Sequence, residues 1–133
     1  MATASGTFTV VMKPGITPSA ADGGTVAHMS GANACQGDLN GTGRGNVLTA
    51  MTATPGSAGY VAMERFEGTL HGKAGSFVFQ HSSTMYRGKP VQSVAVVPDS
   101  GTGELAGISG RLEIHIDGKE HVYSFAYTLP GGK

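Results

Sequence analysis

Apolar and polar side chains alternate along most of this chain with a period of two residues. Such alternation is typical of β-strands that bury one face. No stretch carries apolar residues at the spacing of an amphipathic helix, so no helix is expected. Glycine clusters separate the alternating stretches and predict turns between them. Eight strands are expected, at about residues 5–12, 25–40, 45–54, 59–71, 75–86, 91–97, 104–116 and 119–129.

Eight strands joined by short turns, with no helix to cover a sheet face, predict an all-β fold. An eight-stranded antiparallel barrel is favoured because closure removes the exposed edges of a sheet. A β-sandwich is the alternative. Residues 1–133 have the length of a single domain. The segment "ITPSAADGGT" (16–25) predicts a surface loop, and "GTGRGN" (41–46) predicts a hairpin connection with Arg44 in solvent.

The segment "GTGELA" (101–106) matches the glycine pattern of dinucleotide-binding loops. That pattern binds a pyrophosphate only where a helix begins behind it. Gly107 and Gly110 disfavour a helix here, so a turn is expected and no dinucleotide site.

The hairpin over residues 59–86 shows which side chains face inward. With a turn near residues 72–74, Leu70 lies opposite Phe77, and Phe66 lies opposite His81. One face is then almost entirely apolar and must be the interior. Its members are Tyr60, Ala62, Glu64, Phe66, Leu70, Phe77, Phe79, His81 and Met85.

Two ionisable side chains, Glu64 and His81, fall on this interior face. They lie diagonally across neighbouring strands, at a spacing that side chains can bridge. In the last hairpin, Asp117-Gly118 predicts a two-residue turn that places Ile114 opposite His121. His121 then joins the interior face formed by Leu112, Ile114, Tyr123, Phe125 and Tyr127.

Composition and charge exclude several classes of function. The chain has 22 glycines but only six prolines, and nine basic residues balance nine acidic ones. A neutral chain has no electrostatic footprint for nucleic acid or an anionic membrane, so neither partner is expected. Cys35 is the single cysteine, and the first ten residues lack the features of a signal peptide. A cytoplasmic location is the expectation.

The pair of Glu64 and His81 has two readings. The carboxylate could fix the imidazole tautomer and leave the other nitrogen facing a ligand, as in a proton-transfer pair. Alternatively, the two groups form a hydrogen-bonded core pair, since burying both is costly unless they are paired. A metal triad of Glu64, His81 and His121 lacks the usual ligand spacing, so no metal and no other cofactor are expected. Nothing near Cys35 suggests a depressed thiol pKa, so it is not expected to act as a nucleophile.

Three functions stay open at this point. The first is a barrel that binds a small, largely apolar molecule. The second is a cofactor-independent isomerase or cyclase in which His81 moves a proton with help from Glu64. The third is a structural or oligomerisation module with a filled core, and a homo-oligomer also stays open. Besides Glu64 and His81, the expected ligand-binding residues are Tyr60, Phe66, Phe77, Phe79, His121, Tyr123, Phe125 and Tyr127.

Three segments carry a resemblance to a known family. "GDLNGTGRG", "GSAGYVAMERFEGTLHGKAGSFVFQHSSTM" and "VVPDSGTGELAGISG" together resemble the bacterial domain-of-unknown-function family numbered 3224. The segment "SGTGELAGISGRLEI" is also similar to the glycine-rich strand pair of allene oxide cyclases, which implies an eight-stranded barrel of that type. The family pattern commonly places an aromatic residue and a histidine before Gly-Asp-Leu, where this chain has Cys35 and Gln36. The resemblance implies no activity.

Overall fold

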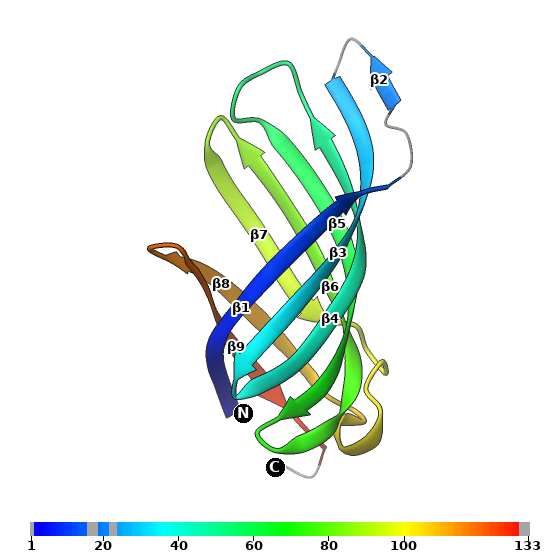
Figure 1. Ribbon diagram of the computed structural model, residues 1–133, viewed down its shortest axis with the longest axis vertical. Helices are drawn as coiled ribbons and strands as arrows, with labels where there is room; N and C mark the ends of the chain where they lie inside the picture. The colour runs from blue at the N-terminus through cyan, green and yellow to red at the C-terminus, as the bar shows by residue number, and fades with distance from the viewer. Residues whose placement is uncertain (1, 16–18, 22–23, 131–133) are drawn as a thin grey trace.

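The strands of the computed structural model close into an antiparallel barrel (Figure 1). The structure describes residues 2–15, 19–21 and 24–130. Neighbouring strands follow the order β1-β9-β8-β7-β6-β5-β4-β3, and pairing of β1 with β3 completes the circle. The all-β barrel of eight long antiparallel strands is therefore confirmed, and the sandwich is excluded. The strands are β1 (Ala2–Pro14), β2 (Ser19–Ala21), β3 (Gly24–Gly37), β4 (Leu39–Met51), β5 (Ala58–Leu70), β6 (Lys73–Tyr86), β7 (Lys89–Val96), β8 (Ser109–Asp117) and β9 (Glu120–Thr128).

The short strand β2 pairs with the beginning of β3 and lies outside the circle. The segment expected to be a loop at 16–25 thus contains three residues of strand, while 16–18 and 22–23 lie outside the described residues. In the described part of the chain, the helical content is one 3-10 turn, η1 (Gly103–Leu105). No helix there is long and apolar enough to cross a membrane.

The hairpin of β5 and β6 has the predicted faces but a different register. The chain turns at His71-Gly72, where both residues have positive φ angles of 48° and 80°. Two such residues form the tight turn that suits a two-residue hairpin. Leu70 therefore pairs with Lys73 and not with Phe77. Because the pairing shifts by four residues, an even number, every side chain stays on its predicted face.

The hairpin of β8 and β9 shows a similar shift. Its turn is Gly118-Lys119, with Gly118 at a φ of 63°, so Asp117 still belongs to β8. Ile114 lies opposite Tyr123, two residues from the expected partner His121. The register again differs by an even number of residues, so His121 stays on the interior face.

The expected hairpin connection at 41–46 is wrong, because these residues form the middle of β4. The chain turns earlier, at Gly37-Asp38, where Gly37 has a φ of 108°. The Asp38 carboxylate accepts a hydrogen bond from the Ser5 backbone N–H at 3.0 Å. The hydroxyl of Tyr123 accepts a hydrogen bond from the Leu39 N–H at 2.9 Å and can donate one to the Gln36 carbonyl at 3.0 Å. It therefore bonds to the residues on both sides of this turn. Arg44 is exposed, as predicted.

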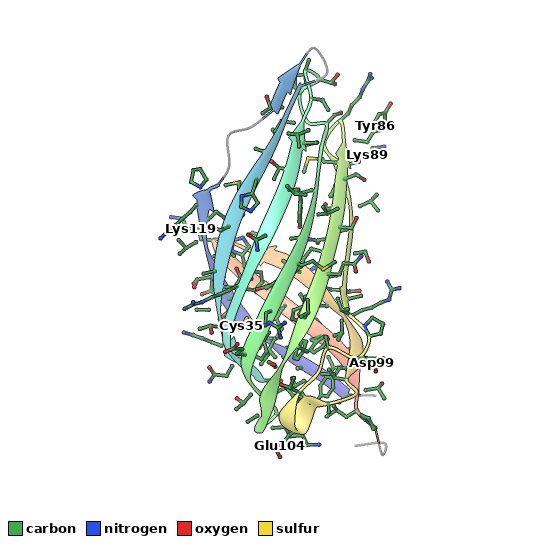
Figure 2. The ribbon with its side chains drawn as sticks, turned by 90° about the vertical axis from the view of Figure 1, so that its right-hand side faces the viewer. Cys35, Tyr86, Lys89, Asp99, Glu104 and Lys119 are labelled. Atoms are coloured by element: carbon green, nitrogen blue, oxygen red, sulfur yellow. The ribbon has the colours of Figure 1, made fainter. Side chains whose placement is uncertain are left out.

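The expected strand at 104–116 begins only at Ser109. The residues before it form η1 and a turn, which agrees with the turn expected for "GTGELA". Leu105 and Ile108 are buried in this segment and cover one end of the barrel. The Glu104 carboxylate fastens the segment to β6 by accepting a bond from the Ala74 N–H at 3.0 Å. Figure 2 shows Glu104 at this closed end, far from Tyr86 and Lys89.

The barrel wall is weakest between β7 and β8. A single residue pair, Ala95 with Arg111, joins these strands. Beyond this pair the hairpin of β8 and β9 leans away from β7 (Figure 1). The barrel is therefore closed at the end near η1 and open toward the other end.

Candidate functional site

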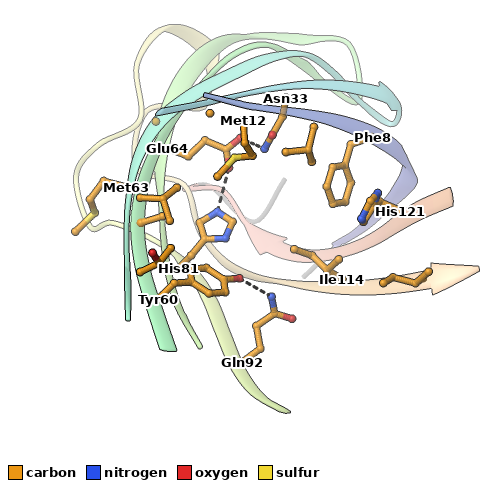
Figure 3. A pocket seen from close by; sticks show the side chains of 17 residues that line it. Phe8, Met12, Asn33, Tyr60, Met63, Glu64, His81, Gln92, Ile114 and His121 are labelled. Atoms are coloured by element: carbon orange, nitrogen blue, oxygen red, sulfur yellow. Dashed lines mark hydrogen bonds and ion pairs between the residues drawn. The ribbon is translucent and has the colours of Figure 1, made fainter. Parts of the chain in front are cut away.

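The open half of the barrel contains a cavity of about 480 Å³. Side chains from every long strand contribute to its lining (Figure 3). The lining residues are Phe8, Val10, Met12, Gly31, Asn33, Gly45, Val47, Thr49, Tyr60, Ala62, Met63, Glu64, His81, Gln92, Ile114, Ile116 and His121. Most of these are apolar, and the polar members other than His121 gather on one wall.

The centre of this polar wall is the pair of Glu64 and His81. Their contact is confirmed, with 3.0 Å between the Glu64 Oε1 and the His81 Nε2. Ala62 is directly opposite His81, so Glu64 reaches the imidazole along the diagonal of the two strands. Both side chains are largely covered, with exposed fractions of 12% for Glu64 and 13% for His81. A buried carboxylate in this setting needs a partner for each oxygen.

Asn33 supplies the second partner of Glu64. Its side-chain amide nitrogen donates a hydrogen bond to Oε2 of the carboxylate. Gly43 leaves the room for that oxygen, because a Cβ at position 43 would lie 2.1 Å from Oε2. Sequence reasoning missed both residues, since it placed a turn where β4 runs. The signal that could have found them is the glycine at every second position, 41, 43 and 45, which marks the interior face of one strand.

The second nitrogen of His81 faces the cavity. Since Nε2 lies against a carboxylate, the proton of a neutral imidazole is assigned to Nε2, and Nδ1 carries the lone pair. No described residue forms a hydrogen bond with Nδ1, yet no buried side-chain nitrogen or oxygen atom in that part of the chain lacks a partner. Nδ1 is therefore accessible from the cavity, and Figure 3 shows it on the side of the ring away from Glu64, toward Tyr60.

Tyr60 flanks His81 on the side away from Glu64. Its hydroxyl oxygen accepts a hydrogen bond from the Gln92 side-chain nitrogen at 3.1 Å. Tyr60 pairs with Ser83, two residues beyond His81, so the phenol and the imidazole are diagonal neighbours on one face. Gln92 on β7 was not expected in the site. The sequence alone does not show which side chains lie near the place where β7 and β8 are joined by a single residue pair.

The facing wall is apolar except for His121. The Phe8 ring lies 5.2 Å from the His121 ring, centroid to centroid, and Ile114 lies beside them (Figure 3). His121 was predicted to face the interior, whereas Phe8 was not named as a site residue. This wall can contact the hydrocarbon part of a bound molecule.

Six other aromatic residues that were expected to bind a ligand do not line the cavity. They pack in the closed half of the barrel, where each is nearly or fully buried. These residues are Phe66, Phe77, Phe79, Tyr123, Phe125 and Tyr127. Ring contacts join Phe66, Phe77, Phe79, Phe125 and Tyr127; for example, the centroids of Phe77 and Phe79 are 4.9 Å apart.

Cys35 lies on the interior face near Glu64. Burial, and secondarily the charge of Glu64, raise the pKa of the thiol to about 12. A thiol that stays protonated is a poor nucleophile, which agrees with the expectation for this residue. Within the described residues, no three His, Cys, Asp or Glu side chains lie close enough to hold a metal ion. Glu64, His81 and His121 do not form such a group.

Fold and site together define a small antiparallel barrel with an internal cavity in one half. The family described as "Protein of unknown function (DUF3224)" matches residues 4–127, and the chain belongs to this family. A crystal structure of a DUF3224 protein of unknown function from Shewanella oneidensis MR-1 has 38% sequence identity, with 97% of each chain covered and a TM-score of 0.93. No curated protein matches this chain. The likeness to allene oxide cyclases stays a prediction.

Proposed function

We propose that this protein binds a small, largely apolar molecule in the open half of its barrel. The observation that carries the proposal is the cavity of about 480 Å³ with one polar wall. Ligand sites in proteins have volumes of about 300–1,000 Å³, apolar walls and a few placed polar groups. The cavity has these three properties.

The cost of the cavity supports the same function. Apolar side chains around this open space contact water instead of other side chains, which forgoes the stability that their burial would give. In a module that only needed rigidity, larger residues at Ala62 or Val47 could fill this space. Glu64 is also the one buried charged or polar residue of the described chain. A buried carboxylate with its partners is weak evidence for stability and is better explained by a role toward a ligand.

The experiment is a fluorescence titration with the uncharged probe N-phenylnaphthylamine. We expect saturable binding to the wild-type protein and at least about a tenfold loss in Ala62→Phe, which fills the cavity from β5. The matched control is Val61→Phe, because Val61 is the adjacent residue, points outward and is exposed. A second blocking variant, Val47→Phe, covers the case in which Ala62→Phe does not fold. Equal probe binding by the wild type and both blocking variants would contradict the proposal.

A second candidate function is proton transfer without a cofactor, as in an isomerase or cyclase. It is favoured by one observation, the 3.0 Å contact that orients His81 through Glu64. An oriented imidazole with an accessible Nδ1 can remove a proton from a bound substrate. The test is exchange of the acidic C–H protons of tetralone in D₂O, followed by NMR. Faster exchange with wild type than with His81→Gln is expected, and equal rates would remove this candidate.

A further inference from the structure

We infer that the molecule bound in the cavity is uncharged and carries a hydroxyl group, as an alcohol or a phenol does. The inference rests on the proposed function and specifies the class of ligand. Some hydrogen-bonding atoms of the polar wall already have partners, and others are free to meet a ligand. The free ones, on His81 and Tyr60, define the chemistry of the ligand.

His81 offers one free position, an acceptor. In the neutral imidazole assigned above, Nε2 donates to the Glu64 carboxylate at 3.0 Å, so the lone pair of Nδ1 faces the cavity. A ligand atom that meets Nδ1 must therefore be a hydrogen-bond donor. A ketone, an ether or a carboxylate oxygen cannot donate.

Tyr60 offers the complementary position, a donor. Its oxygen already accepts the bond from Gln92 at 3.1 Å. Its own hydroxyl hydrogen has no partner among the described residues and is free for a ligand. Because Tyr60 and His81 are diagonal neighbours on one face, one ligand group can reach both. A hydroxyl oxygen can donate to Nδ1 and accept from Tyr60 at the same atom.

The charges around the cavity disfavour an ionised ligand. Neither lysine nor arginine is present in the lining given by the described residues, and its second histidine, His121, lies on the facing wall against the Phe8 ring. The one carboxylate, Glu64, has a bond to each of its oxygens, from His81 and from Asn33. A carboxylate ligand would face the Nδ1 lone pair beside Glu64, and an ammonium ligand would find no free carboxylate oxygen. Burying either charge without a partner is costly.

The experiment compares four naphthalenes that differ only in one substituent at the same ring position. Naphthol donates and accepts, methoxynaphthalene only accepts, methylnaphthalene does neither, and naphthoate is an anion. Binding near neutral pH is followed by displacement of N-phenylnaphthylamine. We expect naphthol to bind about tenfold more tightly than methylnaphthalene, with naphthoate the weakest. In Tyr60→Phe the advantage of naphthol over methylnaphthalene should fall several-fold, whereas the exposed control Tyr86→Phe should keep it.

The outcomes separate this inference from the proposed function. If the probe binds but methylnaphthalene or naphthoate binds as tightly as naphthol, the inference is wrong and the proposed function stands. The same holds if Tyr60→Phe leaves the preference for naphthol unchanged. If neither the probe nor any of the four naphthalenes binds, the proposed function is wrong, and the inference fails with it.

Discussion

The two halves of the barrel are built from the same strands but differ in what fills them. In the closed half, Phe77 is fully buried and its ring lies 5.3 Å from Phe66 and 5.8 Å from Phe125. In the open half, the same faces carry a cavity, and Met12 on its wall is 40% exposed. One strand can therefore serve stability at one end and a ligand site at the other.

The change takes place within a few residues of β5 and β6. Along β6, Phe77 and Phe79 fill the core, and the next inward residue is His81. Along β5, Phe66 is followed toward the open end by Glu64 and then by Ala62. Aromatic side chains thus give way to two ionisable groups and a small one, at the level where β8 leaves β7. Stability should depend on the closed half, and ligand affinity on the open half.

The largest expected effect is the loss of a core aromatic residue. Phe77→Ala should lower the free energy of unfolding by about 3–5 kcal/mol, because a fully buried ring is removed and the space cannot collapse. Met12→Ala on the cavity wall should cost less than about 1 kcal/mol, since Met12 is already in contact with solvent. Urea unfolding of both variants measures the difference. Equal losses would contradict the division of the barrel into two halves.

The next effect concerns the turn between β3 and β4. Tyr123→Phe should cost about 1–3 kcal/mol, because the buried Leu39 N–H loses its acceptor. Tyr86→Phe is the control, since Tyr86 is exposed and should change stability by less than about 0.5 kcal/mol. Thermal unfolding compares the two. If both variants unfold like the wild type, the hydroxyl of Tyr123 does not hold the turn.

A smaller change in stability is expected from replacing the polar pair of the open half. His81→Leu alone leaves Glu64 buried without one of its partners and should destabilise the protein. The double variant with Glu64→Gln removes the unpaired charge and should unfold within about 2 kcal/mol of the wild type. It should nevertheless lose affinity for naphthol. A double variant that binds naphthol with unchanged affinity would mean that the two residues form only a core pair.

The smallest effect at neutral pH is a pH dependence that comes from Cys35 and develops only in alkaline solution. The thiol has an ordinary pKa near 9, and the folded protein raises it to about 12 by burial. Between these values the unfolded chain binds fewer protons than the folded one, so stability falls as the pH rises above about 9. Cys35→Ala should show a shallower fall, measured by chemical unfolding at several pH values. Burial also raises the pKa of Tyr123 and Tyr127, and the charge of Cys35 adds to the rise at Tyr123, so replacing Cys35 acts in the same direction through Tyr123. Identical slopes would contradict the assignment.

The faces of the strands and the contact between Glu64 and His81 could be predicted from the sequence. Side chains alternate strictly along a strand, so an error of two or four residues in the register leaves each of them on the right face. The diagonal contact also survived because His81 lies two residues from both Ser83, the expected partner of Glu64, and Phe79, its actual partner.

The rest of the site depends on packing that no local pattern shows. Asn33 meets Glu64 only because β3 and β4 pair along their full length, and the glycines of β4 resemble a turn when taken alone. The aromatic residues were placed on the correct face, but the face does not indicate which end of the barrel is filled. That division depends on η1 at one end and the single pair between β7 and β8 near the other.

The most direct test of the account is an NMR titration of the isotope-labelled protein with naphthol. Saturable shifts are expected at residues of the cavity wall, such as Phe8, Tyr60, His81 and Ile114. Signals of the closed half, such as those of Phe77, should not move. Shifts that do not saturate, or that spread over the outer surface or the closed half and leave the cavity wall unchanged, would contradict the claim that the open half of the barrel is a ligand site.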